Sequence, residues 1–297
     1  MNRIQHLSRN ATMNSVELMD VVSNNIFGYT MNGHRARRWT FNDFMNGGEI
    51  NDGGFKMTQG KAEPRPGEWS KMMIKGRGFF TVQDPKYQKT YYTRLGDFHL
   101  DGAGNMVSSE GFRLQAIPLA GAATHLNSPD PANPDYDQVN PNFVDPFNNP
   151  YTNNAQQINA PGQALGGVAD VNLGIDRRNG RYLGRYDSIK VGQDGVIYGR
   201  DGNNLVSLYR LSVVAFNNPD GLVNAKDGIY FKSSDTSGLP SYSVSGNIVV
   251  NEALEKSNAW VKLEAHYLTD AQRYFQAATQ VHKLADKISG TAIEMIQ

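Results

Sequence analysis

The 297-residue sequence has no cysteine, no net charge and no long apolar run. The absence of cysteine excludes disulfides, thiolate nucleophiles and cysteine metal sites. The 29 basic and 29 acidic residues cancel, so no overall field favours nucleic acid or an anionic membrane. No stretch approaches the roughly 18 apolar residues that a membrane span needs. Charges such as Arg3, Arg9 and Asp20 interrupt residues 1–30, so we expect no cleavable signal peptide.

The sequence also lacks the common catalytic sequence motifs. It contains no HExxH, no GxSxG and no P-loop, and its six histidines do not cluster. His266 and His282 lie too far apart on a predicted helix to share a metal, so we interpret them as surface or packing residues. No residue constellation supports an enzyme, and we predict neither a cofactor nor a metal.

Two short segments imitate ligand-binding motifs. The segment Gly76–Phe80 resembles half of a dinucleotide fingerprint, but the third glycine is missing and a strand follows. The segment Asp101–Asn105 resembles the start of a calcium loop, but Ala103 occupies a ligand position and no glutamate closes the loop. We therefore predict a tight bend at the first segment and a hairpin turn at the second.

The middle of the chain favours antiparallel strands. It contains most of the 30 glycines and six Asp-Gly pairs, which suit the positive φ of tight turns. Strands separated by turn residues are expected over 72–117, and the segment 189–198 repeats the same strand, turn and strand. We predict a β-rich domain over 72–253. Its Pro- and Asn-rich insertion at about 119–168 either covers part of the domain or contacts a partner.

The two ends show apolar residues at helical spacing. We predict helices within 1–30 and 254–297, the second starting near residue 253 and reaching roughly 65 Å. The narrow, alanine-rich stripe of the second helix suits close packing against another helix. Two partners remain open: the N-terminal helix of the same chain, or helices of other subunits. The predicted class is α+β, with a coiled-coil-like domain of both terminal helices, a connector at 31–71 and the central β-domain.

Several segments together resemble the flagellar rod and hook proteins. Near the N-terminus the match is Met19-Asp-Val-Val-Ser-Asn-Asn-Ile26, and the β-domain is entered through Thr58-Gln59-Gly60 and Gly76-x-Gly-Phe-Phe80. The most specific block is Tyr92-Thr-Arg-x-Gly-x-Phe98. Two further segments follow in the order expected for the family, Phe216-Asn-Asn-Pro-x-Gly-Leu222 and Leu254-Glu-x-Ser-Asn258. His34 and Phe27-Gly28-Tyr29 depart from the usual residues of the family. The resemblance covers most of the chain except about 119–185.

This resemblance implies a self-assembling structural subunit in the bacterial flagellum. It implies type III export without a cleaved signal, polymerisation into a helical tube through the terminal helices, and a location in the periplasmic part of the basal body. Implied partners are other copies, other rod and hook proteins, the export apparatus and the surrounding outer rings. The length and the single β-domain favour a rod protein over a hook protein, and the segment 45–68 favours the distal over the proximal rod. A secreted β-rich adhesin or binding module is the alternative from another class.

The residues expected at the assembly interface come from both ends. Asn24 and Asn25 fit the end of the first helix, and Ser257 and Asn258 fit the cap of the second. The full predicted set is Ile4, Leu7, Ala11, Leu18, Val22, Asn24, Asn25, Ser257, Asn258, Val261, Leu268, Ala271, Gln272, Arg273, Phe275, Ala278, Ala285 and Ile288.

Overall fold

The computed structural model describes residues 3–41, 50–119, 168–175, 180–242 and 247–294. The predicted insertion at 119–168 therefore lies almost wholly outside the described residues. The chain divides into two compact units. The helical unit comprises Met1–Met31, Arg35–Lys56 and Ser257–Gln297, and the β-unit comprises Asn32–His34 and Met57–Lys256.

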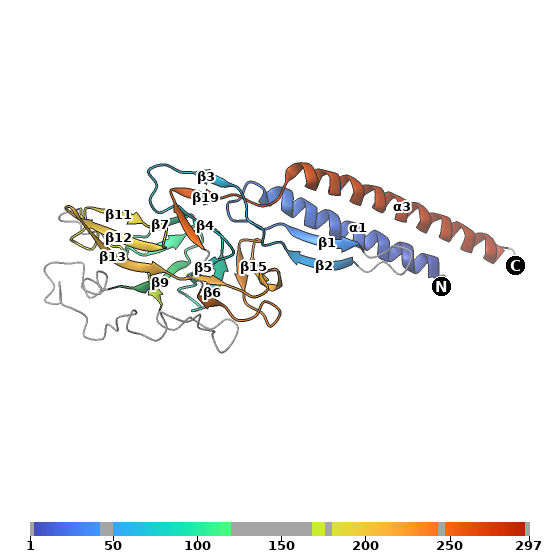
Figure 1. The fold of residues 1–297 in the computed structure, drawn as a ribbon. Coiled ribbons are helices and arrows are strands. Elements are labelled where there is room, and N and C mark those ends of the chain that lie inside the picture. Colours follow the sequence, from blue (N-terminus) through green and yellow to red (C-terminus); the bar gives the residue numbers. More distant parts are fainter. Residues whose placement is uncertain (1–2, 42–49, 120–167, 176–179, 243–246, 295–297) are drawn as a thin grey trace. The chain divides into compact units, whose positions relative to one another are not determined.

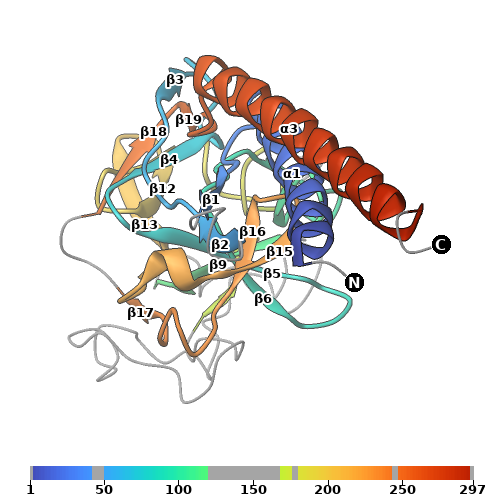
Figure 2. The same ribbon diagram turned by 90° about the vertical axis from the view of Figure 1, so that its right-hand side faces the viewer.

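The helical unit pairs two long helices with a short hairpin. Its elements are α1 (Arg3–Gly28), β1 (Arg37–Phe41), β2 (Ile50–Phe55) and α3 (Val261–Glu294). The helices run antiparallel, because Gln5 donates a 2.8 Å hydrogen bond to Asp286 at one end and Asn25 donates a 3.1 Å bond to Glu264 at the other. Figures 1 and 2 both show α1 and α3 side by side. Neither helix is long and apolar enough to cross a membrane.

The predicted start of the second helix is wrong. Residues Ala253–Glu255 form strand β19, and α3 begins only at Val261. Ser257 and Asn258 therefore precede the cap position, and Ser257 Oγ instead accepts a 3.1 Å bond from the Ala259 N–H. The first helix likewise continues past Asn25 to Gly28, so that asparagine does not end it.

The β-unit is built from antiparallel strands. A 3-10 helix, η3 (Pro219–Gly221), lies between β14 and β15. The strands are β3 (Ala62–Pro64), β4 (Met72–Lys75), β5 (Phe79–Gln83), β6 (Thr90–Thr93), β7 (Phe98–Leu100), β8 (Met106–Ser108), β9 (Arg113–Pro118), β10 (Ala169–Asp170), β11 (Ser188–Val191), β12 (Val196–Asp201), β13 (Asn204–Leu211), β14 (Val213–Ala215), β15 (Val223–Lys226), β16 (Tyr230–Lys232), β17 (Ser241–Tyr242), β18 (Ile248–Asn251) and β19 (Ala253–Glu255).

One large sheet carries most of these strands. Its main order is β11-β12-β13-β9-β5-β6-β16-β15, with β7, β8, β10, β14 and β17 attached to its sides. Two small pairs, β18 with β4 and β19 with β3, join the C-terminal part of the unit to its start. Every described pairing in the unit is antiparallel. The α+β class with an antiparallel β-domain is confirmed, whereas the coiled-coil geometry of the helices stays a prediction.

The two predicted hairpins are also confirmed. Strands β7 and β8 pair around the turn at Asp101, whose carboxylate accepts the N–H groups of Ala103 and Asn105 at 2.9 and 2.8 Å. These hydrogen bonds, helped by the Asn105 side chain, hold the pKa of Asp101 below its usual value although burial opposes them. Strands β11 and β12 form the second hairpin, over the predicted segment.

Aromatic side chains fill the core of the β-unit. Phe79 and Tyr92 both meet Phe216 edge to face, at centroid distances of 5.8 and 4.9 Å, and Phe80 meets Phe98 at 5.6 Å. These perpendicular contacts place ring edges against ring faces, which the ring quadrupoles favour. All except Phe216 are at most 1% exposed, so the β-unit has its own hydrophobic core.

The backbone of Gly96 lies in close contact with the backbone of Met72 at the start of β4. A Cβ atom there would lie 1.6 Å from the Met72 carbonyl oxygen, and the Met72 N–H donates to the Gly96 oxygen at 2.9 Å. Gly96→Ala must therefore push the loop between β6 and β7 away from the start of β4, and we expect the free energy of unfolding to fall by about 2–3 kcal/mol. Urea denaturation followed by Trp69 fluorescence, in a background with Trp39→Phe and Trp260→Phe, measures this. Gly102→Ala is the control, because nothing lies within 4 Å of its Cβ position. Equal effects of both variants would contradict the argument.

Candidate assembly surface

Small side chains line the contact between α1 and α3. Ala271, Ala278 and Ala285 recur every seventh residue on α3, and all are at most 5% exposed. On α1 the matching buried residues include Ser8, Ala11 and Ser15. Both serine hydroxyls bond to carbonyl oxygens of their own helix, and Ser8 Oγ also lies 3.1 Å from His282 Nδ1 on α3. Such residues let the helix axes approach closely but bury little apolar surface. The pair therefore gains limited hydrophobic stabilisation from its own contact.

A buried polar cluster fixes the other end of the helix pair. Glu264, with a side chain 0% exposed, accepts a 2.5 Å bond from Arg38 Nη1 and a 3.1 Å bond from Asn25 Nδ2. Arg38 also lies over the ring of Tyr267, 5.7 Å from its centroid. Because an uncompensated buried carboxylate is costly, this cluster joins α1, β1 and α3 in one register.

Two asparagines attach the backbone of β1 to the helices. The Arg37 N–H donates to Asn25 Oδ1 and Asn25 Nδ2 donates to the Arg37 oxygen, both at 2.9 Å. Asn258 accepts from the Ala36 N–H at 2.7 Å and donates to the Lys56 oxygen at 2.6 Å. Each side-chain amide thus satisfies one main-chain donor and one main-chain acceptor, which makes the hairpin part of the helical unit.

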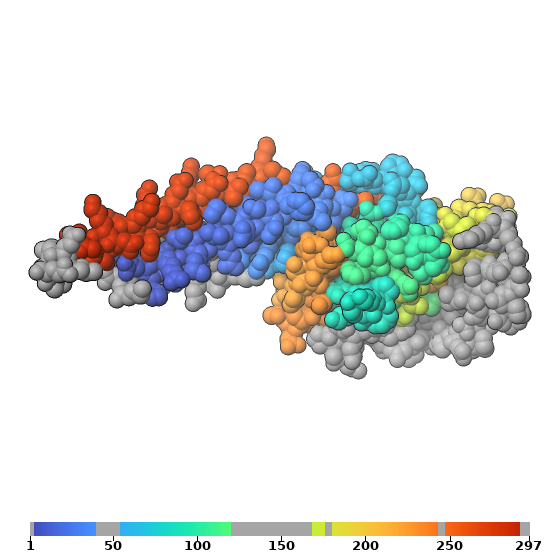
Figure 3. Space-filling view, turned by 180° about the vertical axis from the view of Figure 1, so that it is seen from behind, coloured from blue at the N-terminus to red at the C-terminus, as the bar shows by residue number. Residues whose placement is uncertain are grey.

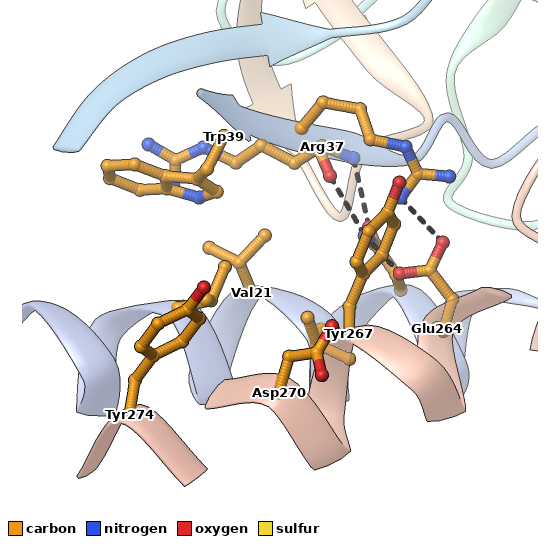
Figure 4. Close-up of a pocket in the computed structure, with 11 residues that line it drawn as sticks. Val21, Arg37, Trp39, Glu264, Tyr267, Asp270 and Tyr274 are labelled. Carbon is orange, nitrogen blue, oxygen red and sulfur yellow. Dashed lines mark hydrogen bonds and ion pairs between the residues drawn. The ribbon is translucent and has the colours of Figure 1, made fainter. Parts of the chain in front are cut away.

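A pocket of about 260 Å³ lies between α1, β1 and α3. Val21 and Val22, which are 5% and 2% exposed, line it together with Leu18. Trp39 and Tyr274 border the same space with Tyr267 and Asp270, as Figure 4 shows. Its volume is below the about 300–1,000 Å³ of typical small-molecule pockets, so it suits one or two side chains better than a cofactor.

Large apolar side chains face outward from the two helices. In the part of the chain that the structure describes, the helical unit exposes five of them at residues 4–29 and eight at residues 260–288, against five in the β-unit. Val281, Leu284 and Ile288 form an outer row on α3, with exposed fractions of 41%, 59% and 57%. Figure 3 shows the red side chains of α3 along the edge of the blue α1. Clustered exposed apolar groups of this kind mark interaction surfaces.

The sequence is similar to known flagellar proteins. A family profile described as the flagellar hook protein FlgE/F/G D1 domain matches residues 73–199, within the β-unit. The flagellar basal-body rod protein FlgG of Buchnera aphidicola subsp. Baizongia pistaciae is 22% identical over 299 residues, which cover 91% of this chain and 90% of that protein. The chain belongs to the flagellar rod and hook protein family.

A second member of the flagellar family matches over a shorter region. The flagellar hook protein FlgE of Escherichia coli (strain K12) is 28% identical over 129 residues, 42% of this chain. The matched region is only 32% of that hook protein. Both relatives are structural proteins and not enzymes, so this chain is assigned to the axial structural proteins of the flagellum.

The structure separates the predicted interface residues of this flagellar protein into three groups. Within the helical unit, Ala11, Val22, Asn25, Ser257, Ala271, Ala278 and Ala285 are buried. Leu7, Leu18, Asn258, Leu268 and Phe275 are half-buried. Ile4, Asn24, Val261, Gln272, Arg273 and Ile288 are exposed. The intramolecular pairing that the sequence left open is thus present, and a role of these residues between subunits stays a prediction.

The predicted interface set missed Leu284 of the exposed row, and Arg38 and Glu264 of the polar cluster. Tyr274, Val281 and Ile288 recur every seventh residue on α3, as do the buried alanines, so the spacing could have indicated a second apolar face. Arg38 and Glu264 had no such signal, because only the fold brings them together. Among the described residues, no group of three or more metal-ligating side chains is present.

Proposed function

We propose that this chain is a structural subunit of the flagellar rod that polymerises helically into the axial drive shaft, which transmits torque from the motor to the hook and filament. The observation that carries the proposal is the match to a rod protein over 91% of this chain and 90% of that protein. A rod protein of similar length thus aligns with most of this chain. The segment 45–68 favours the distal rod.

The surface of the helical unit supports assembly as the main role. The small residues face inward and the large apolar residues face outward, so burial of the latter requires another chain. Contacts between different surfaces of identical copies, repeated without closure, generate a helical filament. The proposed partners are other copies, neighbouring rod and hook proteins, the type III export apparatus and the surrounding rings. The proposed location is the periplasmic part of the basal body.

A hook protein is the second candidate, because the hook relative shows the higher local identity of 28%. Gold labelling of an epitope-tagged chain in purified hook–basal bodies separates the two functions. Label between the membrane rings is expected for a rod subunit, and label beyond the outermost ring would indicate a hook protein. Absence of label from purified flagella would overturn both, and favour the secreted binding module.

Ile288→Glu tests whether the helical unit carries assembly. The side chain is 57% exposed, so the substitution should leave the subunit folded while placing a charge on the apolar row. We expect at least a ~10-fold rise in the protein concentration needed for polymers, about 1.4 kcal/mol of contact energy. Electron microscopy and sedimentation measure this.

Leu205→Glu is the matched control, because Leu205 is also 57% exposed but lies in the β-unit. We expect it to polymerise like the parent chain. Equal loss in both variants would argue against a special role of the helical unit.

A further inference from the structure

The pocket of the helical unit has a size and a lining that suit a single inserted side chain. Its buried part is apolar, with Val21 and Val22 from α1, while Tyr267 and Tyr274 on α3 are 37% and 45% exposed. Trp39 from β1 closes a further side. Hot spots in protein interfaces are commonly single bulky side chains inserted into such preformed pockets.

The outer row of α3 supplies side chains of a matching kind. Leu284 is 59% exposed, the highest value in the row that it forms with Val281 and Ile288. An aliphatic side chain this exposed gains transfer free energy when it enters an apolar pocket. The row and the pocket therefore have complementary surfaces, although both belong to the same unit.

One copy cannot bring these two surfaces together by itself. Tyr274 and Leu284 lie on the same uninterrupted helix, and ten residues at 1.5 Å per residue separate them by roughly 15 Å. Leu284 of one copy can therefore reach only the pocket of another copy. A contact between two different surfaces of identical chains is heterologous, and it generates an open helical filament when the rotation between copies does not close a ring.

Charge favours the same contact. Arg38 and Glu264, which also line the pocket, pair with each other, and the guanidinium of Arg37 lies over the Trp39 ring, 4.9 Å from its centroid. Asp270 is the remaining charged residue of the lining, and its closest ion-pair contacts are long, 3.5 Å to His266 and 3.8 Å to Arg273. Beside Leu284 on α3, Lys283 and Lys287 are exposed, while Asp286 contacts Gln5 and His282 of its own copy. When Leu284 approaches the pocket, these two lysines carry positive charge towards Asp270, which adds directional preference to the apolar contact.

We propose that the pocket between α1, β1 and α3 receives Leu284 from the outer row of a second copy of this chain. The contact rests on the proposed function, since it is the step by which one subunit would hold the next. It names the two faces that meet, which membership of the flagellar family does not specify.

Disulfide trapping tests this contact directly, because the native chain has no cysteine. Cells of the source bacterium express Tyr274→Cys and Leu284→Cys chains together, each with a tag of different size, and their basal bodies are isolated and oxidised. A disulfide requires Cα atoms within about 7 Å, and each chain carries a single cysteine, so a disulfide between the two tagged chains reports a contact between copies. We expect a dimer carrying both tags, at least ~10-fold more abundant than with Met13→Cys in place of Leu284→Cys. Met13 is 60% exposed, like Leu284, but it lies on α1 and outside the outer row.

The outcomes separate this contact from the proposed function. Basal bodies that contain both chains but show no mixed-tag dimer, or equal linking by the Met13 control, would overturn the contact and leave the rod assignment standing. Absence of even the parent chain from basal bodies would overturn both. As a second measurement, Leu284→Asp should reduce incorporation at least ~10-fold, and undiminished incorporation of this variant would also overturn the contact.

Discussion

Replacing Glu255 by alanine is expected to lower the free energy of unfolding of the β-unit by about 3–5 kcal/mol. Glu255 Oε2 lies 2.9 Å from Arg94 Nε, and the two side chains are 0% and 2% exposed. Arg94 also donates to the carbonyl oxygens of Gly76, Ile74 and Gly78. The substitution leaves a buried guanidinium without its counter-charge and removes the acceptor of the Gly60 N–H, which is 2.7 Å from Glu255 Oε1.

Urea denaturation measures this effect when the signal comes from the β-unit alone. Trp69 lies in the β-unit against Tyr182, whereas Trp39 and Trp260 lie in the helical unit. A background with Trp39→Phe and Trp260→Phe therefore reports the β-unit through Trp69 fluorescence. Both the parent and the variant are compared in this background, so that the two added changes cancel.

A surface ion pair provides the matched control for the buried one. Arg185 and Asp201 are also 2.9 Å apart, but their side chains are 47% and 36% exposed. Asp201→Ala should therefore cost less than about 1 kcal/mol. A comparable loss in both variants would show that burial does not set the importance of the Glu255 pair.

The second large effect is a steep loss of β-unit stability above pH 10. Burial raises the pKa of Tyr230 and of Tyr242 to about 12, and it also raises the pKa of Tyr92 and of Tyr209. Tyr242 adds to the shift of Tyr92 because two phenolates would repel each other. All four rings lie in the β-unit, so their effects act on the same unfolding reaction.

The sign follows from proton binding. Between pH 10 and 12 the unfolded chain releases these phenolic protons while the folded chain keeps them, so stability present below pH 10 is lost as the pH rises. Each tyrosine contributes a slope of about 1.4 kcal/mol per pH unit in this window, and the four together contribute about 5 kcal/mol per pH unit. Urea denaturation at several pH values gives the slope, and absorbance at alkaline pH follows phenolate formation.

Single substitutions test the origin of this slope. Tyr242→Phe should reduce it by about one proton, which corresponds to about 1.4 kcal/mol per pH unit. Tyr87→Phe serves as the control, because that ring is 61% exposed in the β-unit and we expect the slope to remain as in the parent. A slope unchanged by Tyr242→Phe would show that other groups cause the alkaline transition.

The helices and hairpins could be predicted from sequence because their signals are local. Apolar spacing near 3.6 residues identified both terminal helices, and Asp-Gly pairs identified the hairpins around Asp101 and Asp194. The motifs of the rod and hook family could also be recognised in the sequence. Arg94, Gly96 and Glu255, which lie within them, now have physical roles as a buried ion pair and a close backbone contact.

The start of α3 could not be predicted in the same way. Residues from 253 continue the helical spacing, but Leu254 and Glu255 are 2% and 1% exposed within the β-unit. Pairing of β19 with β3 and the ion pair to Arg94 outweigh the local preference for helix. A helical pattern shows which residues would lie on one face of a helix. It does not show that a residue distant in sequence, here Arg94, binds one of them and holds it in a strand.

The sequence by itself determined the α+β class, the terminal helices, the main hairpins and the family of this protein, because these depend on periodicity, turn chemistry and local motifs. Only the tertiary structure decided which apolar face of α3 is covered. The alanines at 271, 278 and 285 face inward, and Val281, Leu284 and Ile288 remain outside. Both sets have helical spacing, and the difference arises because only small side chains allow α1 and α3 to approach closely. The same approach places β1 beside them and creates the pocket.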